Sequence, residues 1–522
     1  MKTRYYNARV YTGEGFCDSF TVEDGRFVSA DIADESIDLQ GSFVCAGFND
    51  SHMHILSFGQ SLIMAKLNEH TSSLKEMLEY MRSFIAQRNF KENAWIRGRG
   101  WNQDYFTDVK RMPTKADLDK LSMDRPMMLT RACGHCCVVN SKALEIANIT
   151  ADTIAPLGGA IDFENGLIYD NAFDLIENCI PLPDKDELKE MMEESSKALN
   201  AFGITSSHSD DYSCFRAIPF ETINEAFKEL IKEGKLTVRV NEQSNFNDYE
   251  EFKRFVKAGN VTGVGDDRFR IGPLKLLGDG SLGGRTAHLT EPYNDDPSTC
   301  GFSLFTDEQF KQMISYANAH DISVAVHAIG DACLDKVLNA IEDALNENPR
   351  EDHRHGIVHC QISRKDQLDR MIRLKTHIYA QSVFLDYDNH IVEDRVGKEL
   401  ASTSYNWKTL MDGVLTVSNG SDAPVEIPDT LRGIECAITR TSLDGTGPYL
   451  PEQAFSVKEA LDSFTINSAK ASFEEDHKGL IKDGYLADFV VLEEDPFTVD
   501  PKKIHEIKVK ATYLGGQCVY QN

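Results

Sequence analysis

The sequence lacks any apolar run close to the ~18 residues that cross a membrane as a helix. Its first residues, MKTRYYNARVYTGEG, also lack the apolar core of a signal peptide. We therefore expect a cytoplasmic protein that binds no membrane. Positive charge is scarce, because 55 Lys and Arg stand against 83 Asp and Glu, for a net charge of −28. The electrostatic field of this negative charge repels polyanions, which argues against nucleic acid as a partner.

Cysteine is too sparse for a secreted disulfide scaffold, because the 12 cysteines are irregularly spaced over 522 residues. Buried small side chains or free thiols are expected instead. One pair, Cys133 and Cys136, has the C-x-x-C spacing of thiol-disulfide redox proteins. Such a site needs a thioredoxin-type fold of ~100 residues around it. No segment of that kind surrounds the pair, so redox activity remains an alternative only.

Both ends of the chain consist of short β-type runs separated by turn residues such as Asp483-Gly484. Residues 1–45 and 474–522 are therefore predicted to form one small β-sandwich. The 46–473 segment between them differs, because from about residue 200 short apolar runs alternate regularly with helical patterns. Repeated strand and helix indicate βαβ units and a parallel sheet.

The predicted fold class is α/β, a TIM-type (β/α)8 barrel, because eight strands close such a barrel. The eight expected strands lie near residues 45, 203, 236, 271, 322, 355, 377 and 414. Residues 60–195 do not follow this alternation of strand and helix patterns, and they carry β runs of their own. They are predicted to be an inserted subdomain after the first barrel strand, over the C-terminal face where barrel active sites lie.

Histidines follow three of the expected strands. His52 and His54 come directly after the first, and their spacing of two allows both imidazoles to reach one ion. His327 ends the run ISVAVHAIG on the same face as Ser323 and Ala325, so it is expected to point into the barrel. His359 closes the next strand. Each alone is equally explained as a hydrogen-bonded core histidine.

Two further polar side chains lie on later strands. Asp422 follows the last one; it caps a helix or serves as a metal ligand and proton acceptor. Lys275 lies within the apolar run RIGPLKLLGDG, where a buried ammonium is costly. Its side chain either reaches solvent or reacts as the neutral amine with carbon dioxide to form a carbamate.

The six side chains together point to a metal site, because all are predicted to lie at the C-terminal ends of barrel strands. Imidazole and oxygen ligands without thiolate favour Zn²⁺, with Mn²⁺, Fe²⁺ and Co²⁺ as alternatives. The motifs GFNDSHMH, GWNQD, GHCCVVNSKAL, LKLLGDGSLGGRTAHLTEPY, VAVHAIGDACLD, NGSDAPV and GLIKDGYLADFVVLEEDP carry a resemblance that spans the whole chain. The sequence resembles the amidohydrolase superfamily, in its N-substituted formamide deformylase-like branch.

This resemblance implies one or two divalent metal ions per chain in the barrel. His52 and His54 would bind the first metal. Lys275, as its carbamate, would bridge to a second metal held by His327 and His359. Asp422 would bind the first metal and act as the proton acceptor, so that Asp422, His359 and Lys275 take part in catalysis. The implied reaction is hydrolysis of a non-peptide amide-type C–N bond in a small-molecule substrate.

Three residues in the family motifs are candidates for contacts with the substrate: Trp101, His135 and Arg285. The resemblance also favours a homodimer.

Two alternatives remain. A metal-binding protein of this fold without hydrolytic activity is one. The other is dinucleotide binding through the G-x-G-x-x-G of residues 278–283, which would require a helix to begin there.

Overall fold

The computed structural model describes residues 1–522 except 31, 89, 92–93, 133–135, 157–158 and 414. The chain divides into two compact units. The first comprises residues 1–58 and 188–522, and the second comprises residues 59–187. Within the described part of the chain, no helix has the length and apolar character needed to cross a membrane.

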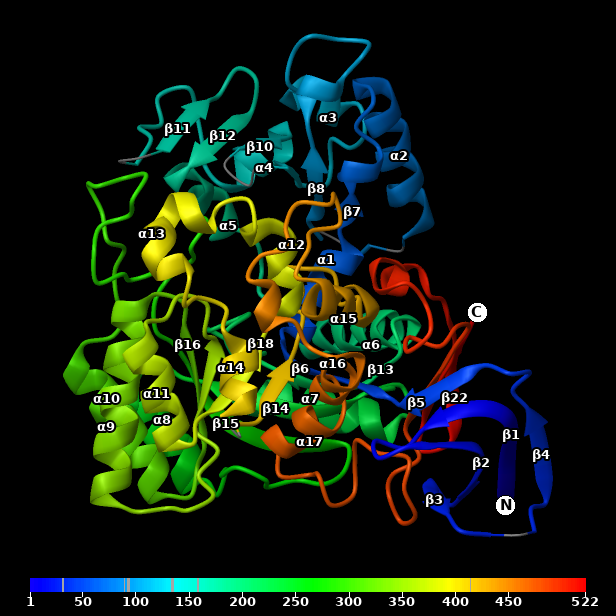
Figure 1. Cartoon of the computed structure of the whole chain (residues 1–522). Helices are drawn as coiled ribbons and strands as arrows, with labels where there is room; N and C mark the ends of the chain where they lie inside the picture. The colour runs from blue at the N-terminus through cyan, green and yellow to red at the C-terminus, as the bar shows by residue number, and fades with distance from the viewer. Residues whose placement is uncertain (31, 89, 92–93, 133–135, 157–158, 414) are drawn as a thin grey trace. The chain divides into compact units, whose positions relative to one another are not determined.

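The first unit contains the predicted barrel of eight parallel strands (Figure 1). Hydrogen bonds join neighbouring strands in the order β19-β18-β17-β16-β15-β14-β13-β6. The strands are β6 (Phe48–Met53), β13 (Ile204–Ser209), β14 (Arg239–Asn245), β15 (Phe269–Leu277), β16 (Val324–Ala328), β17 (Gly356–His359), β18 (His377–Ala380) and β19 (Val417–Asn419). The eight strands expected from the sequence are confirmed.

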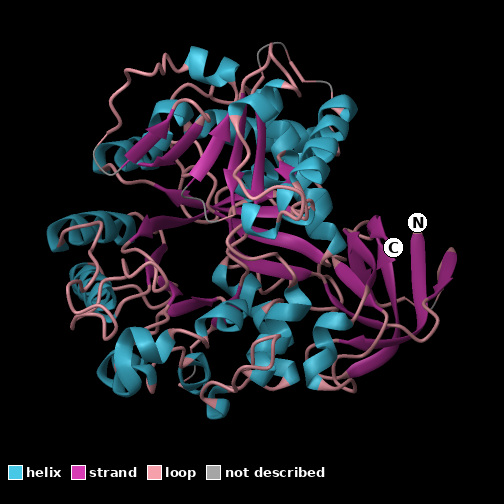
Figure 2. Ribbon diagram, turned by 90° about the horizontal axis from the view of Figure 1, so that it is seen from above, coloured by secondary structure: helices cyan, strands magenta, loops and turns pink. Residues whose placement is uncertain are grey.

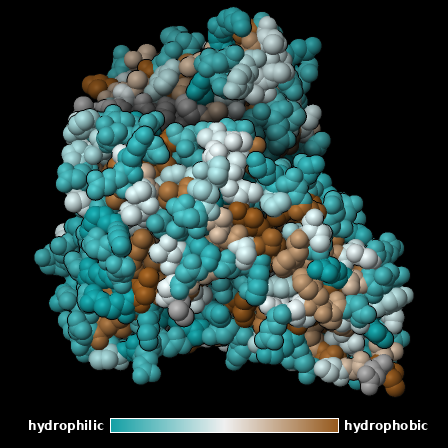
Figure 3. Space-filling view, in the orientation of Figure 1, coloured by the Kyte–Doolittle hydropathy of each residue, from teal (hydrophilic) through white to brown (hydrophobic). Residues whose placement is uncertain are grey.

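Helices connect these strands and cover the barrel. Each buries an apolar face; in α10, for example, Leu334, Leu338 and Ile341 are fully buried at helical spacing. The face in view in Figure 3 is largely hydrophilic over α9, α10 and α11. The helices are α1 (Ile55–Ile63), α6 (Lys185–Ala201), α7 (Phe220–Lys232), α8 (Tyr249–Lys257), α9 (Asp307–Ala319), α10 (Asp331–Glu347), α11 (Lys365–Leu374), α12 (Leu385–Asp388), α13 (Val392–Ala401), α14 (Trp407–Asp412), α15 (Thr430–Thr439), α16 (Val457–Ser463) and α17 (Ile466–Ala471).

Contacts between the first and last strands bring the two edges of the barrel together. The backbone N–H of Asp422 donates to the His52 carbonyl at 2.8 Å, and the Ser421 hydroxyl donates to Asp50 Oδ2 at 2.6 Å. Gly420 permits this approach, because a Cβ there would lie 2.6 Å from the backbone nitrogen of His52. Two segments distant in sequence thereby place His52 beside Asp422.

Gly420→Ala is expected to destabilise the protein by about 1–3 kcal/mol, because the added methyl group meets backbone atoms that have little room to move. Urea denaturation measures the change. Gly15→Ala is the matched control, since a Cβ at Gly15 meets no described atom within 4 Å. Equal stability of the two variants would show that the strands tolerate a wider separation here.

The two ends of the chain form a mixed sheet of eight strands, and both termini lie in it (Figure 2). The two chain ends, which the sequence predicts to form a small β-sandwich, share this one sheet. β5 pairs antiparallel with β20 and runs directly into the first barrel strand. The strands are β1 (Lys2–Tyr11), β2 (Phe16–Glu23), β3 (Arg26–Val28), β4 (Glu35–Asp38), β5 (Phe43–Ala46), β20 (Phe489–Leu492), β21 (Val509–Leu514) and β22 (Gln517–Gln521).

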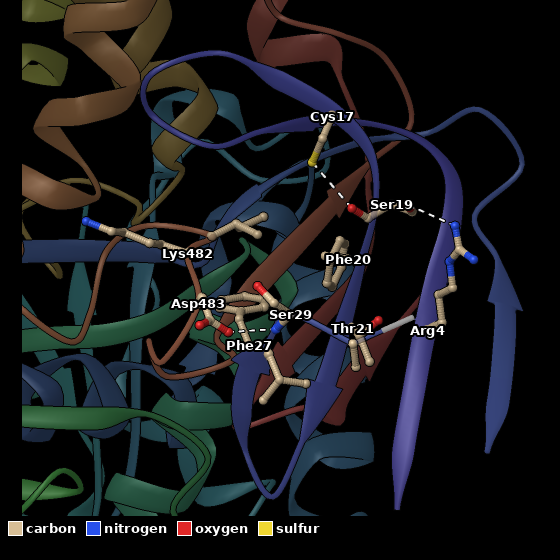
Figure 4. A pocket seen from close by; sticks show the side chains of 12 residues that line it. Arg4, Cys17, Ser19, Phe20, Thr21, Phe27, Ser29, Lys482 and Asp483 are labelled. Atoms are coloured by element: carbon tan, nitrogen blue, oxygen red, sulfur yellow. Dashed lines mark hydrogen bonds between the residues drawn. The ribbon is translucent and has the colours of Figure 1, made fainter. Parts of the chain in front are cut away.

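A pocket of about 380 Å³ lies between the N-terminal strands and residues 481–483 (Figure 4). On its wall the carboxylate of Asp483 accepts a hydrogen bond from the backbone N–H of Ser29 at 2.6 Å. Arg4 donates to the Ser19 hydroxyl at 3.3 Å. The Asp483 contact joins the C-terminal part of the chain to the N-terminal strands.

The second unit has its own six-stranded sheet and apolar cores, and it covers nearly the segment predicted as an insertion. Its sheet runs in the order β11-β12-β10-β9-β8-β7. Its elements are β7 (Ala65–Lys66), α2 (Leu74–Gln87), β8 (Ile96–Trp101), α3 (Lys115–Asp119), β9 (Met127–Arg131), β10 (Cys136–Val139), α4 (Ser141–Ile146), β11 (Gly159–Asp162), β12 (Leu167–Asp170) and α5 (Asp174–Glu177).

Candidate metal centre

Three of the predicted ligands meet at the ends of β6 and β19. Asp422 Oδ1 lies 3.4 Å from His52 Nε2 and 3.1 Å from His54 Nε2. One ligand atom from each side chain lies within 4.8 Å of the others, so the three can bind a single ion. Two imidazoles and a carboxylate form a donor set suited to Zn²⁺ and other divalent first-row metals.

The other predicted histidines lie beside this group. The rings of His327 and His359 are 4.4 Å apart between centroids, and the ring of His359 is 5.7 Å from that of His52. Ala325, two residues before His327, packs against Val358 in the barrel interior. Strand alternation therefore directs His327 inward, as its position in the sequence predicts.

Lys275 lies on β15 and is 1% exposed. Within the described part of the chain, its Nζ has no hydrogen bond and no carboxylate within 4 Å. Burial lowers the pKa of this amine, while the charges of Asp210 and Asp422 oppose the shift. Burial thus makes the neutral amine more accessible than in an exposed lysine, and the neutral amine is the form that reacts with carbon dioxide.

The histidines of the cluster differ in pKa, and therefore in charge. Burial lowers the pKa of His52 and of His359 well below the usual range. Burial has the same effect on His54, but the hydrogen bond to Asp422 and the charge of Asp210 outweigh it and raise the pKa to about 9. Although burial opposes the shift, the hydrogen bond with His54 holds the pKa of Asp422 far below the usual range. Asp422 is thus an ionised carboxylate, as a metal ligand must be.

Two of the candidate ligands have left-handed backbone conformations. His359 has φ 72° and Asp422 has φ 57°, a region that L-residues adopt at a cost of roughly 1–3 kcal/mol. The indole N–H of Trp407 lies 3.0 Å from the carbonyl of His359 and 3.1 Å from that of Cys360. Trp407 therefore helps to hold the bent backbone that turns His359 toward the other histidines.

A model of the amidohydrolase family matches residues 35–520 of the chain. The chain belongs to this family. The protein named "Putative amidohydrolase YtcJ" from Bacillus subtilis (strain 168) is 35% identical over 496 residues, 93% of this chain and 90% of that protein. N-substituted formamide deformylase from Arthrobacter pascens is 23% identical over 502 residues, 93% of this chain and 90% of that protein.

A solved structure, described as an uncharacterized metal-dependent hydrolase from Pyrococcus furiosus, has the same fold as this amidohydrolase-family chain. The two align with a TM-score of 0.79 and 29% identity, over 95% of this chain and 100% of that one. The superfamily and the barrel predicted from the sequence are thereby confirmed.

The predicted substrate-contacting residues have different surroundings. Arg285 binds Asp295 through two nitrogens, at 2.8 and 3.1 Å, and Arg395 contacts the same carboxylate. Trp101 is fully buried in the apolar core of the second unit, where its indole N–H donates to the Leu129 carbonyl. His135 lies outside the described residues, and so does Cys133.

The dinucleotide interpretation of residues 278–283 is not supported. This segment is followed by turns and bends, and the next helix, α9, begins only at Asp307. A pyrophosphate site of that type requires a helix N-terminus directly after the glycines. Gly278 instead permits a close approach of two backbone segments, since a Cβ there would lie 2.4 Å from the His327 carbonyl.

Asp279 was missed by sequence reasoning. Its buried carboxylate accepts hydrogen bonds from the backbone N–H groups of Ile329, at 3.0 Å, and Gly330, at 2.8 Å. It also lies 3.3 Å from His327 Nε2. Asp279 therefore anchors the turn after β16 and the ring of His327. An acidic residue two positions after the apolar run of β15 was the available signal.

Asp388, at the end of α12, is a buried carboxylate outside the histidine cluster. It is 7% exposed, and the Tyr405 hydroxyl donates to it at 2.8 Å. Burial raises its pKa to about 6, although the Tyr405 hydrogen bond opposes this. The folded state therefore holds this proton more tightly than the unfolded chain, whose aspartates have a pKa near 3.9.

The stabilising contribution of this proton is complete below about pH 4 and is lost as the pH rises through about 6. Between those limits the free energy of unfolding of the wild type should fall by about 2 kcal/mol relative to Asp388→Asn. Urea denaturation of both proteins at the two pH values measures this difference. Parallel pH profiles would mean that Asp388 titrates normally.

Proposed function

We propose that this protein is a metal-dependent hydrolase that cleaves a non-peptide amide-type C–N bond of a small molecule. The observation that carries the proposal is the cluster of His52, His54 and Asp422, with Lys275 buried beside it. His327 and His359 extend the cluster. The likeness to N-substituted formamide deformylase supports substrates of the amide class.

His52, His54 and Asp422 would hold one divalent ion, for which we propose Zn²⁺. Lys275 as a carbamate, His327 and His359 would hold a second. When bound, such an ion lowers the pKa of water from 15.7 towards about 7 and polarises a carbonyl oxygen. Buried and ionised, the carboxylate of Asp422 is the group we assign to proton transfer.

Asp422 would take a proton from the attacking water and deliver it to the leaving nitrogen. That nitrogen must gain a proton before the C–N bond breaks, because an amide anion is a poor leaving group. A carboxylate within hydrogen-bond reach of both atoms performs this transfer as a general base and then as an acid. The products are a carboxylic acid, such as formic acid, and an amine.

Metal content per purified chain, by plasma mass spectrometry, tests the proposal directly. About two equivalents, with the intact mass raised by one carbon dioxide, would support the carbamate-bridged form. One equivalent keeps the hydrolase and removes the bridging role of Lys275. A chain that binds no metal after reconstitution would overturn the proposal in favour of a protein of this fold without hydrolytic activity.

Chelator treatment is expected to abolish amide hydrolysis, and added Zn²⁺ or Mn²⁺ should restore it, because the protein groups alone do not activate water at neutral pH. Amine release from a panel of N-formyl and N-acyl amines is the measurement. Circular dichroism verifies that the chelated protein stays folded. Full activity in protein shown to be metal-free would contradict a metal-dependent mechanism.

A further inference from the structure

Two buried glutamines contact candidate metal ligands. Gln243 lies on β14 and is fully buried, and Gln381 follows β18 and is 1% exposed. Gln243 Oε1 lies 2.6 Å from Nδ1 of His52. Gln381 Oε1 lies 2.7 Å from Nδ1 of His359. Gln243 thus contacts one histidine of the group formed by His52, His54 and Asp422, and Gln381 contacts one histidine of the pair His327 and His359.

The orientation of each amide is determined by its second contact. The side-chain nitrogen of Gln243 donates to the Ser51 carbonyl at 3.1 Å, and that of Gln381 donates to the Tyr379 carbonyl at 3.0 Å. A backbone carbonyl only accepts hydrogen bonds, so the NH₂ group must face it. The amide oxygen must then face the imidazole.

We infer that Gln243 and Gln381 are positioning residues that leave Nε2 of His52 and of His359 free to bind metal. An amide oxygen only accepts, so the ring nitrogen facing it must carry the hydrogen. In a neutral imidazole the lone pair then resides on the other nitrogen. In His52 that nitrogen is the atom 3.4 Å from Asp422 Oδ1.

The remaining two histidines each contact a backbone carbonyl, and the Asp279 carboxylate also lies 3.3 Å from His327 Nε2. His54 Nδ1 lies 2.9 Å from the Asp210 carbonyl, and His327 Nε2 lies 3.0 Å from the Gly280 carbonyl. Side-chain substitution does not remove those acceptors. The two glutamines are therefore the contacts at which mutation can release the ring hydrogen without deleting a ligand.

A neutral amide suits this position better than a carboxylate. The cluster already contains the ionised Asp422, and the carbamate proposed at Lys275 would add a second negative charge. A carboxylate partner also makes a ligating imidazole more basic and the bound metal less electrophilic. Gln243 and Gln381 orient their histidines without adding charge to the site.

The inference rests on the proposed function and is tested by metal affinity. Gln243→Met and Gln381→Met keep the side-chain volume but remove the acceptor, so each should weaken Zn²⁺ binding by about 10- to 100-fold. Gln243→Glu and Gln381→Glu keep an acceptor oxygen and should bind Zn²⁺ at least as tightly as the wild type. Competition with a chromogenic chelator measures these affinities.

Gln367→Met is the matched control. Gln367 is fully buried, and its amide contacts the backbone of Asp331 and Arg364 and no histidine. Its Zn²⁺ affinity should be that of the wild type. Equal losses in the Met and Glu variants of Gln243, or wild-type affinity in both Met variants, would overturn the inference.

A measurement without metal separates this inference from the proposed function. In metal-free protein labelled with ¹⁵N-histidine, the ring nitrogen shifts should show His52 and His359 protonated at Nδ1. Gln243→Met should convert His52 to a mixture of tautomers and leave His359 unchanged. Nε2-protonated rings in the wild type would overturn the inference, even if the protein binds Zn²⁺ and hydrolyses amides.

Discussion

Asp422→Asn is expected to lower kcat by about 10³-fold or more while the protein stays folded. Proton transfer by a positioned carboxylate contributes roughly 10²–10⁴-fold to such reactions, and the amide of Asn accepts no proton in this pH range. The variant also loses the negative charge next to His52 and His54. Its backbone hydrogen bond to the His52 carbonyl remains, so the contact between the barrel edges is retained.

Amine release from N-formyl and N-acyl amines measures this effect, together with metal content and melting temperature. Asp388→Asn is the matched control, because Asp388 and Asp422 are both 7% exposed and only Asp422 contacts the histidines. The control should keep wild-type kcat at pH 7. Near-normal turnover in Asp422→Asn would remove Asp422 from proton transfer.

Lys275→Ala is expected to lose at least one equivalent of metal per chain and most of the activity. If the lysine carries a carbamate, its removal deletes an oxygen ligand shared by two ions. Small carboxylic acids such as acetate or propionate are expected to occupy the space left by the side chain and to supply the missing oxygens. Added acid should therefore restore part of the metal content and activity, with saturation at high concentration.

Lys478→Ala provides the comparison for Lys275→Ala. Lys478 is also buried, but it is bonded to Glu474, so its loss should reduce stability without changing the metal content. Acetate should not affect that variant. Full metal content in Lys275→Ala, or restoration of activity by acetate in both variants, would rule out the carbamate bridge.

The barrel and the cluster of ligands follow from patterns that are local in the chain. Apolar runs alternating with helical stretches predict parallel strands, and parallel strands place their C-terminal ends at one rim. A histidine or carboxylate that ends such a run is therefore brought near the others, wherever it lies in the sequence. His52, His327 and Asp422 were predicted to meet for this reason; in the structure His52 and Asp422 share one group of possible ligands, and the ring of His327 packs against that of His359, which lies beside His52.

The contacts that orient those ligands depend on register between distant segments. Gln243 and Gln381 lie within buried strand ends and resemble other polar core residues; only the pairing of the strands brings one to His52 and the other to His359. Gly420 likewise acquires its importance from the approach of β19 to β6. No spacing rule within one segment reveals such pairs.

Contacts between separate segments also decide the surroundings of the two candidate substrate contacts that the structure describes. Trp101 and Arg285 belong to family motifs, yet one is buried in an apolar core and the other is bound to Asp295. Local periodicity was enough to predict the eight strands, because strand alternation and strand ends are local properties, and the sequence motifs carried the resemblance to the family. Tertiary packing alone decided which side chains face the histidine rings, which glycines are required and which polar groups are already bonded, because each depends on atoms of separate segments meeting within a few ångströms.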